Sequence, residues 1–352
     1  GYKGSAIHFM MIDEVQDLTH ATMFLLMQVT DYHIFFSGDT AQTIAKGVGF
    51  RFCDLRQLFD HDRFQNWNSE SVDLEKPAVM QLTQNFRSHG RILDVANSVI
   101  SLIEQFFPQT IDKLAKENSL LDGPKPVLLN TSSVEHLFNF LFGSSMEDAK
   151  TDAGLLNKPP IEFGCDQVII VRDQAAKEAV PKVLQHALIL TVYESKGLEF
   201  DDVILYNFFS DSKSVTQWYN IKNVRVTNRA EERVGYRELG QLEESRQEEE
   251  ETKGEQDETP REIVQEEDDD INKGEEEQNG EAQRRAEDVP DYELETKAGR
   301  FNILKNSAWC TELKHLYVAI TRPRKRLIFF DQNRDARSSV ENYWKSLDVV
   351  DV

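Results

Sequence analysis

Two carboxylates follow directly after an apolar segment near the start of the chain. The apolar segment runs from Ile7 to Ile12, and Asp13 and Glu14 come next. In magnesium-dependent phosphoryl transfer, the first acid at such a strand end holds the metal ion that bridges the nucleotide's terminal phosphates, and the second orients or deprotonates the attacking water. A solvated acidic turn has the same composition, so this pair alone leaves both interpretations open.

A second polar loop follows the apolar segment Tyr32 to Phe36. It contains Gly38, which permits a tight turn, and then Asp39 and Gln42. The amide of Gln42 could sense a terminal phosphate and transmit its loss. If the two apolar segments are neighbouring parallel strands, both polar loops lie at the same edge of the sheet, where functional loops gather.

Two arginines later in the chain could neutralise charge on a transferring phosphoryl group. Arg87 lies ahead of an expected helix, and Arg322 follows the apolar stretch Leu316 to Ile320. An arginine that reaches across a cleft to the phosphoryl group contributes about 10³ to 10⁵ in rate. The sequence therefore offers two candidate arginine fingers.

A glycine-containing loop between two expected strands offers a further nucleotide contact. It holds Lys196, Gly197 and Glu199. The glycine allows the backbone to approach a ligand closely, and the carboxylate could accept a hydrogen bond from a ribose hydroxyl. This loop is a candidate for binding the nucleotide sugar.

The elements that must position these residues alternate between strands and helices. After the first strand, Thr19 is a plausible N-cap for a helix that carries Met23 and Leu26, and the second strand follows. Strand, helix and strand within about thirty residues are typical of a parallel α/β sheet. The same pattern predicts a helix over Arg91 to Phe107 and strands over Gln167 to Val171, Leu188 to Val192, Asp202 to Phe208 and Leu327 to Phe330.

Length and composition indicate a globular protein with room for two domains. The chain has 352 residues and no apolar run long enough to cross a membrane, so membrane insertion is not expected. Its three cysteines, Cys53, Cys165 and Cys310, are odd in number and far apart. This spacing fits neither a disulfide framework nor a metal clip, and it favours a reducing, intracellular location without deciding between nucleus and cytoplasm.

The negative charge of the chain is concentrated in one segment. Residues 241–290 hold 21 acidic and 6 basic side chains, whereas the whole chain has a net charge of −22. The same residues contain no Phe, Trp or Tyr, and so they have too little apolar surface to offset the entropy of ordering. We expect a disordered acidic insertion over 225–295, either a solvated linker or a segment that binds protein partners. Its charge does not exclude a nucleic-acid partner for the rest of the chain.

Five clusters, taken in order, resemble motifs II to VI of the UvrD/Rep-like superfamily 1 helicases. The clusters are Asp13 to Asp17, Gly38 to Gln42, Gln84 to Ser88, Thr191 to Phe200 and Leu316 to Arg322. Stretches outside these motifs are similar to the helicase-like region of the large TPR and ankyrin repeat-containing proteins. Those stretches include Gly49 to Phe52, Phe106 to Pro108, Asp122 to Pro126, Pro160 to Gly164 and Phe200 to Phe209.

The resemblance implies an α/β fold of the P-loop NTPase type with RecA-like parallel sheets. It implies the C-terminal part of a first RecA-like domain at residues 1–76 and a second RecA-like domain at 77–224, completed by 296–335 after the insertion at 225–295. Residues 336–352 would form a C-terminal tail. It further implies that ATP is hydrolysed in the cleft between the two domains and that the partner is single-stranded DNA or RNA.

Carried over residue by residue, the resemblance also implies roles at that cleft. Asp13 would bind magnesium, Glu14 would activate water, and Gln42 would sense the γ-phosphate of ATP. Arg87 and Arg322 would be the arginine fingers. The other residues expected to bind the nucleotide are Gln16, Asp39, Gly197, Glu199 and Thr321, with Glu199 on the sugar.

The chain departs from the helicase pattern at several positions. It contains no Gly-x-x-x-x-Gly-Lys-Ser/Thr phosphate loop, which we expect upstream of Gly1 in the full-length protein. Ala45 stands where these helicases have a base-stacking tyrosine, and Phe50 could either substitute for it or belong to the core. Tyr193 replaces a usual histidine. Pro323 replaces a usual small residue, and this change could affect the direction of the preceding arginine.

The segment between the fourth and fifth motifs is short. Only 104 residues separate Arg87 from Thr191, too few for the accessory domain that UvrD-like enzymes carry there. We therefore expect ATP hydrolysis rather than duplex unwinding. Two interpretations stay open: an ATP-driven motor on nucleic acid, and a helicase-derived scaffold or nucleotide switch within a large repeat protein.

Overall fold

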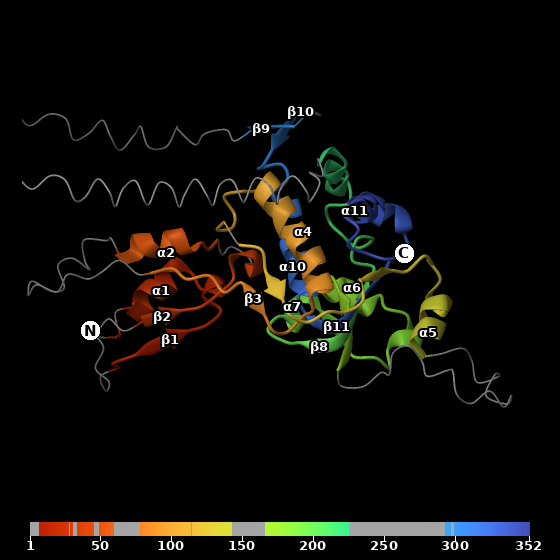
Figure 1. Cartoon of the computed structure of the whole chain (residues 1–352), viewed down its shortest axis with the longest axis horizontal. Helices are drawn as coiled ribbons and strands as arrows, with labels where there is room; N and C mark the ends of the chain where they lie inside the picture. The colour runs from red at the N-terminus through yellow and green to blue at the C-terminus, as the bar shows by residue number, and fades with distance from the viewer. Residues whose placement is uncertain are drawn as a thin grey trace, which may run out of the picture. The chain divides into compact units, whose positions relative to one another are not determined.

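A five-stranded sheet with only parallel pairings forms the centre of the fold (Figure 1). Its strands lie in the order β5 (Val127–Leu128), β11 (Pro323–Phe330), β8 (Phe200–Tyr206), β6 (Gln167–Val171) and β7 (Ile189–Thr191). The computed structural model describes residues 7–27, 29–30, 34–45, 49–59, 78–113, 115–142, 166–224, 293–296 and 299–352. The parallel sheet with its helices confirms the predicted α/β class.

The two faces of this sheet are both buried, as parallel sheets require. Alternate residues of the three central strands point to opposite faces. Val168, Ile170, Val203, Leu205, Leu327 and Phe329 belong to one apolar cluster, and Ile169, Val171, Ile204, Tyr206, Ile328 and Phe330 to a second. The near-continuous apolar runs of these strands therefore reflect burial on both sides.

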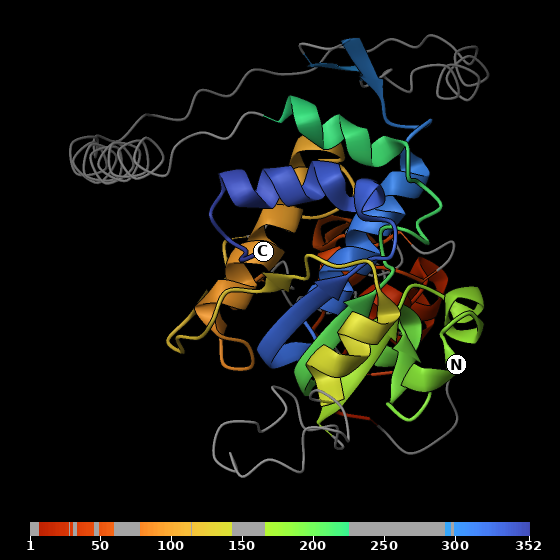
Figure 2. The same cartoon turned by 90° about the vertical axis from the view of Figure 1, so that its right-hand side faces the viewer.

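Helices cover each face of the sheet (Figure 2). The first cluster is completed by α4 (Gly90–Phe106), α10 (Ser307–Ile320), α11 (Arg334–Ser346) and η5 (Gln217–Asn223). The second cluster is completed by α5 (Val134–Phe142), α6 (Gln174–Glu178) and η4 (Lys182–Leu184). This arrangement buries α10 almost completely, including Trp309 and Leu316, and β11 begins three residues after the helix ends.

A small parallel pair of strands carries the first two polar loops. It consists of β1 (Met10–Ile12) and β2 (Ile34–Phe36), joined by η1 (Val15–Asp17) and α1 (His20–Met27). The predicted N-cap of α1 is confirmed, since Thr19 Oγ1 accepts a 3.2 Å hydrogen bond from the backbone of Thr22. After β2 come η2 (Thr40–Gln42) and α2 (Phe52–Phe59).

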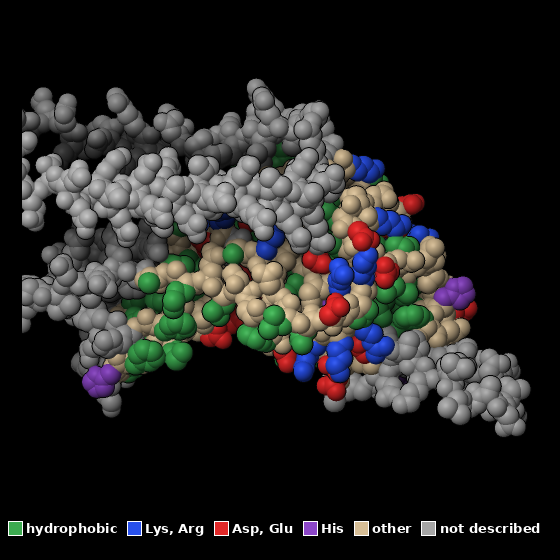
Figure 3. Space-filling model, in the orientation of Figure 1, with side chains coloured by type: hydrophobic (Ala, Val, Ile, Leu, Met, Phe, Trp, Pro, Cys, Tyr) green, Lys and Arg blue, Asp and Glu red, His purple; other side chains and the backbone are tan. Residues whose placement is uncertain are grey.

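The prediction of a buried strand over Ile7 to Ile12 is wrong in length and in burial. The strand begins at Met10, and the side chains of Phe9 and Met11 are 60% and 68% exposed. Only one side of β1 and β2 packs on the small core around Val15 and Phe50. The other side carries the exposed apolar side chains of Phe9, Met11 and Phe35, in a part of the molecule where apolar surface is visible in Figure 3.

Three other predicted elements agree with the structure within one or two residues. The predicted strand Gln167 to Val171 is observed unchanged as β6, and the predicted helix Arg91 to Phe107 is α4, one residue earlier at each end. The strand predicted over Asp202 to Phe208 lies two residues earlier as β8. It ends there because Asn207 adopts a left-handed backbone with φ of 52°.

Two predictions about strand ends need correction. The strand expected over Leu188 to Val192 stops at Thr191, whose side chain instead caps the short helix α7 (Val192–Ser195) in a capping box with Glu194. The last strand, expected over Leu327 to Phe330, begins four residues earlier as β11, so that Arg324, Lys325 and Arg326 lie inside it.

The remaining described elements are two small strand pairs. β3 (Gln84–Asn85) pairs in parallel with β4 (Asn118–Ser119), and β9 (Glu293–Thr296) pairs in antiparallel with β10 (Gly299–Asn302). The predicted acidic insertion over 225–295 lies outside the described residues except for its last three, which belong to β9. None of the described helices combines the length and apolar character needed to cross a membrane.

Candidate functional site

The loops after β1 and β2 lie side by side and are joined through their backbones. Ser37 N donates to Ile12 O at 2.8 Å, and Val15 N donates to Ser37 O at 3.0 Å. The hydroxyl of Ser37 also donates to Oδ1 of Asp13 at 2.5 Å. This hydrogen bond, followed by one from the backbone of Glu14, lowers the pKa of Asp13, so this exposed carboxylate stays ionised at neutral pH.

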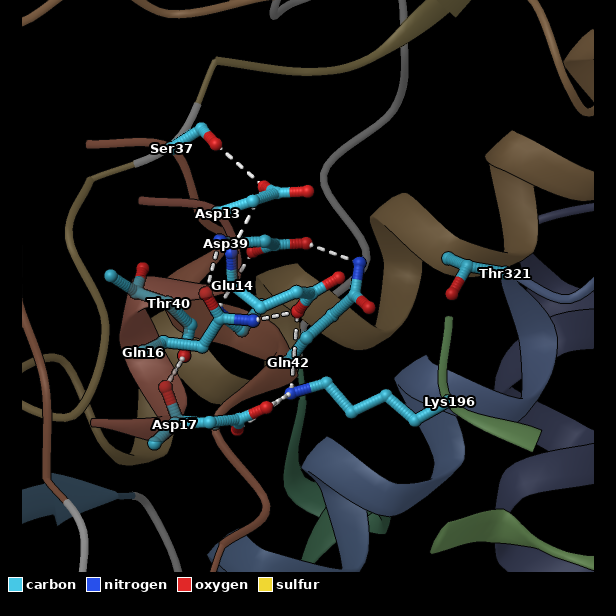
Figure 4. A network of polar contacts seen from close by, with 12 residues as sticks. Asp13, Glu14, Gln16, Asp17, Ser37, Asp39, Thr40, Gln42, Lys196 and Thr321 are labelled. Carbon is cyan, nitrogen blue, oxygen red and sulfur yellow. Dashed lines mark hydrogen bonds and ion pairs between the residues drawn. The ribbon is translucent and has the colours of Figure 1, made fainter. Parts of the chain in front are cut away.

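Glu14 adopts a left-handed backbone conformation, with φ of 51° and ψ of 39°. Such a conformation is costly for a residue with a Cβ and is found mainly where a site requires it. Its carboxylate accepts a hydrogen bond from the Gln16 amide and lies 3.5 Å from the ammonium of Lys196 (Figure 4). Lys196 makes a closer ion pair, 2.6 Å long, with Asp17.

Gln16 connects the two acidic loops. Its side chain is fully buried, and its Oε1 accepts the backbone N–H of Asp39 at 3.2 Å. Gly38 packs so closely here that a Cβ at its position would overlap Oε1 of Gln16 and lie 2.9 Å from Cγ1 of Val15. The glycine is therefore required by close packing, whereas its backbone does not have the positive φ that a turn would demand of glycine.

Asp39 points inward and holds the start of η2. Its carboxylate accepts hydrogen bonds from the backbone of Ala41 at 2.9 Å and from the amide of Gln42 at 2.8 Å. Burial raises the pKa of Asp39, and these hydrogen bonds oppose the shift. From α10, the buried ammonium of Lys314 donates to the carbonyl of Thr40 at 3.3 Å. In this structure Asp39 positions Gln42.

Arg322 reaches this loop from the end of α10. Its guanidinium, in a residue only 1% exposed, donates to Gln42 Oε1 at 3.1 Å and to Thr321 Oγ1 at 2.9 Å. Two backbone carbonyls, those of Val318 and Leu198, accept its other hydrogen bonds at 2.8 and 3.2 Å. Burial, followed by the nearby charge of Arg87, lowers the pKa of Arg322 to about 10, so it is still a cation at neutral pH.

The second candidate finger lies at a more open place. Arg87 is paired with Glu199 at 2.8 Å, and Arg324 lies 3.5 Å from the same carboxylate. These three residues line a pocket of about 490 Å³ together with Gln84, Asn85 and Phe86. Gly197, two residues before Glu199, has φ of 78°, a conformation that glycine adopts without strain.

The structure therefore arranges the sequence-predicted residues in two groups. Asp13, Glu14, Gln16, Asp39, Gln42, Thr321 and Arg322 form one hydrogen-bonded set with Lys196, and Arg87 and Glu199 form a second. Arg87 affects the pKa of Arg322 by its charge, so the two groups are neighbours.

Several residues near the sequence motifs have structural roles. Phe50 is 2% exposed and belongs to the core around Val15, which excludes it as a substitute base-stacking residue. The hydroxyl of Tyr193 donates to the backbone carbonyl of Ile44. Asp202 is buried and bound by Arg326 at 2.6 Å, and no group of His, Cys, Asp or Glu with metal-ligand geometry occurs among the described residues.

Three polar or aromatic residues at the site were not found by sequence reasoning. Lys314 and Tyr317 sit on the buried face of α10, and Phe86 is 80% exposed beside Arg87. No distinctive signal marks Lys314 and Tyr317, because the same helix also carries Glu312 and His315. No local signal distinguishes an exposed phenylalanine from a buried one, so Phe86 required the structure.

The chain is similar in sequence to known proteins, among them the following two. It is 38% identical over 353 residues, 99% of its length, to the human "TPR and ankyrin repeat-containing protein 1". The chain spans only about a tenth of that relative, as the match covers 10% of it. It is also 23% identical over 219 residues, 60% of its length, to a "Probable DNA helicase" of Mycoplasma pneumoniae, of which the match covers 38%. No family model matches the chain.

Proposed function

We propose that this chain contributes the hydrolytic side of a RecA-like, superfamily 1 nucleotide site, in a protein that couples ATP hydrolysis to movement on nucleic acid. The observation that carries this proposal is the hydrogen bond between Gln42 and Arg322. It joins the loop after β2 to the end of α10, the two places where the helicase resemblance expects the γ-phosphate sensor and an arginine finger. The weak similarity to a helicase, at 23% identity, supports the same reading.

The acidic loop has the chemistry that a magnesium nucleotide needs. Asp13 is exposed and ionised, and hard cations such as Mg²⁺ prefer carboxylate oxygens. Magnesium bound there would neutralise charge on the terminal phosphates. Glu14, held by Gln16, would orient a water molecule for attack. Its left-handed backbone sets the direction in which the side chain leaves the loop.

The cationic groups suit the developing negative charge. Arg322 is desolvated and so interacts more strongly with an anion than an exposed arginine would. Arg87 lines the neighbouring pocket. There the Glu199 carboxylate would give up its ion pair with Arg87 and accept a hydrogen bond from a sugar hydroxyl. The exposed ring of Phe86 in the same pocket offers a surface on which a base could stack.

The sequence contains no Gly-x-x-x-x-Gly-Lys-Ser/Thr loop, so the proposal requires that the full-length protein supply one. A second candidate function is a nucleotide-binding scaffold without translocation. Two features favour it: Ala45 stands where the helicases have a base-stacking tyrosine, and Phe50 is buried in the core and cannot substitute. The 38% identity to a repeat-containing protein is compatible with both functions.

ATP hydrolysis by the full-length protein, measured with and without single-stranded DNA or RNA, tests the proposal. We expect nucleic acid to stimulate phosphate release by the native protein. Glu14→Gln removes the base but keeps the size and the hydrogen-bonding oxygen of the side chain, so hydrolysis should fall by at least 10²-fold. Hydrolysis without stimulation favours the scaffold, and an unchanged rate in the variant contradicts the assignment of Glu14.

A further inference from the structure

Glu117 lies between the two candidate arginine fingers and belongs to none of the sequence motifs. It directly precedes β4, and its two carboxylate oxygens have different partners. Oε2 accepts the Asn85 amide at 2.7 Å, and Oε1 accepts the hydroxyl of Tyr317 at 3.1 Å. One side chain therefore joins the strand before Arg87 to the helix before Arg322.

Asn85 holds the turn that presents Arg87. Its Oδ1 accepts the backbone N–H of Arg87 at 2.8 Å and that of Ser88 at 2.9 Å. An asparagine amide has two distinct ends, and only the oxygen end can accept these hydrogen bonds. Because the Glu117 carboxylate accepts from the NH₂ end, it keeps the oxygen directed at the turn. Without Glu117 the amide would lose its orienting partner.

The other oxygen of Glu117 accepts a hydrogen bond from α10, the helix that leads to Arg322. Tyr317 is 3% exposed, and burial raises the pKa of its hydroxyl well above the ordinary value, so the hydroxyl remains a donor. The charge of nearby Asp39, whose carboxylate holds the Gln42 amide, adds to the effect of burial on this pKa. Gln42 in turn accepts a hydrogen bond from Arg322. Glu117 is therefore hydrogen-bonded both to the turn of Arg87 and to the helix that leads to Arg322.

The backbone of Glu117 is fixed independently by α4. Its N–H donates to Oδ1 of Asn97 at 3.3 Å, and its carbonyl accepts from Nδ2 of Asn97 at 3.1 Å. A direct hydrogen bond also joins the residues that follow Arg87 and Arg322, since Ser88 Oγ donates to the carbonyl of Pro323 at 2.6 Å. Glu117 is thus held on a rigid element, as a supporting residue of a precise site must be.

We propose that Glu117 is a positioning residue that fixes the turn of Arg87 relative to Arg322, so that both guanidinium groups reach one phosphoryl group together. This inference rests on the proposed function, because it assigns Glu117 a task in the same site. Glu117 itself would touch neither nucleotide nor water. Its effect would therefore be on the rate of the chemical step, because both arginines act on the transition state, and not on ground-state binding of the nucleotide.

Steady-state ATP hydrolysis by the full-length protein is the first test. Glu117→Ala and Asn85→Ala break the same hydrogen bond from opposite ends, and each should lower kcat by about 10- to 100-fold with KM changed by no more than about threefold. The double variant should be little worse than either single one, since both remove one contact. Glu117→Gln retains an oxygen that can accept from Asn85 and should restore most of kcat. Glu135→Gln, exposed on α5 at the opposite face of the sheet, is the matched control.

Hydrogen exchange of the same variants separates this inference from the proposed function. Exchange of the Arg87 and Ser88 amides should become faster in Glu117→Ala, while the amides of β6 keep their protection. Faster exchange together with an inactive native protein would overturn the proposed function and leave Glu117 as the residue that orders this turn. Unchanged exchange in Glu117→Ala, or an unchanged kcat in an active protein, would overturn the positioning role.

Discussion

The guanidinium of Arg322 and the amide of Gln42 share a 3.1 Å hydrogen bond although 280 residues separate them in sequence. The amide has a fixed orientation, because its NH₂ end donates to half-buried Asp39 and only its oxygen is left for Arg322. An anion that attracts Arg322 competes with this hydrogen bond. The position of the loop after β2 is therefore coupled to whatever Arg322 binds.

Replacing Arg322 by Ala should abolish nucleotide hydrolysis with little effect on nucleotide affinity. An arginine that acts on the transferring phosphoryl group contributes about 10³ to 10⁵ in rate. Hydrolysis and the nucleotide Kd are measured in parallel on the full-length protein. Arg334→Ala, at the exposed start of α11, is the control and should retain the native rate. A retained rate in Arg322→Ala would remove this residue from the site.

Replacing Phe86 by Ala should weaken nucleotide binding. The ring is 80% exposed in the pocket that Arg87 and Glu199 line, and stacking of a base on an aromatic ring contributes about 1 to 3 kcal/mol. Calorimetric titration with ATP should therefore show Kd raised roughly five- to 150-fold. Leu82→Ala is the control, because Leu82 is 94% exposed and does not line the pocket. Equal Kd values in the two variants contradict a role for the ring.

Replacing Gly38 by Ala should destabilise the loop that carries Asp39. The added methyl group would overlap Oε1 of Gln16, which accepts the backbone N–H of Asp39. Overpacking of this kind costs about 1 to 3 kcal/mol. Denaturant unfolding should show this loss for Gly38→Ala and a change within about 0.5 kcal/mol for Gly49→Ala, where an added Cβ meets nothing within 4 Å. Similar stabilities would mean that the Gln16 side chain moves aside without cost.

Elements with strong local patterns were the ones that sequence alone predicted. β6 is five consecutive apolar or buried residues, and α4 places Ile92, Val95 and Val99 on one buried face. The end of β7 was not predicted well, since the capping box of Thr191 and Glu194 competes with strand continuation. The start of β11 was predicted too late, because Asp201 and Asp202, the partners of Lys325 and Arg326, come from the neighbouring strand.

The candidate site shows the same division between local and long-range information. The order of the motifs indicated that the loop of Gln42 and the segment of Arg322 belong together, and they are in contact. The inward direction of the Asp39 side chain was not predictable, because it depends on the packing of this loop against α10, which is distant in sequence. Glu117 had no local signal either, since its partners lie 32 and 200 residues away in sequence.

Asp331 should make the free energy of unfolding depend on pH in a recognisable direction. The carboxyl is 1% exposed and accepts the backbone N–H groups of Phe209 and Ser210 at 3.1 Å. Burial raises its pKa to about 6 from an ordinary value of 3.8, against the opposing effects of these hydrogen bonds and of Arg337. Below about pH 4 the group is protonated in both the folded and the unfolded state. Between about pH 4 and 6 only the folded state keeps the proton, so its stability falls as the pH rises.

Asp331→Asn isolates this contribution, because the amide keeps an oxygen for the two N–H groups and does not titrate in this range. Urea unfolding of both proteins between pH 4 and pH 7 gives the difference in their free energies of unfolding, in which the other carboxylates cancel. The native protein should lose roughly 3 kcal/mol relative to the variant by pH 7, at about 1.4 kcal/mol per unit of pKa. A difference that stays constant across this range would mean that Asp331 is ionised in the folded protein throughout, with Arg337, 3.8 Å away, outweighing the cost of burial.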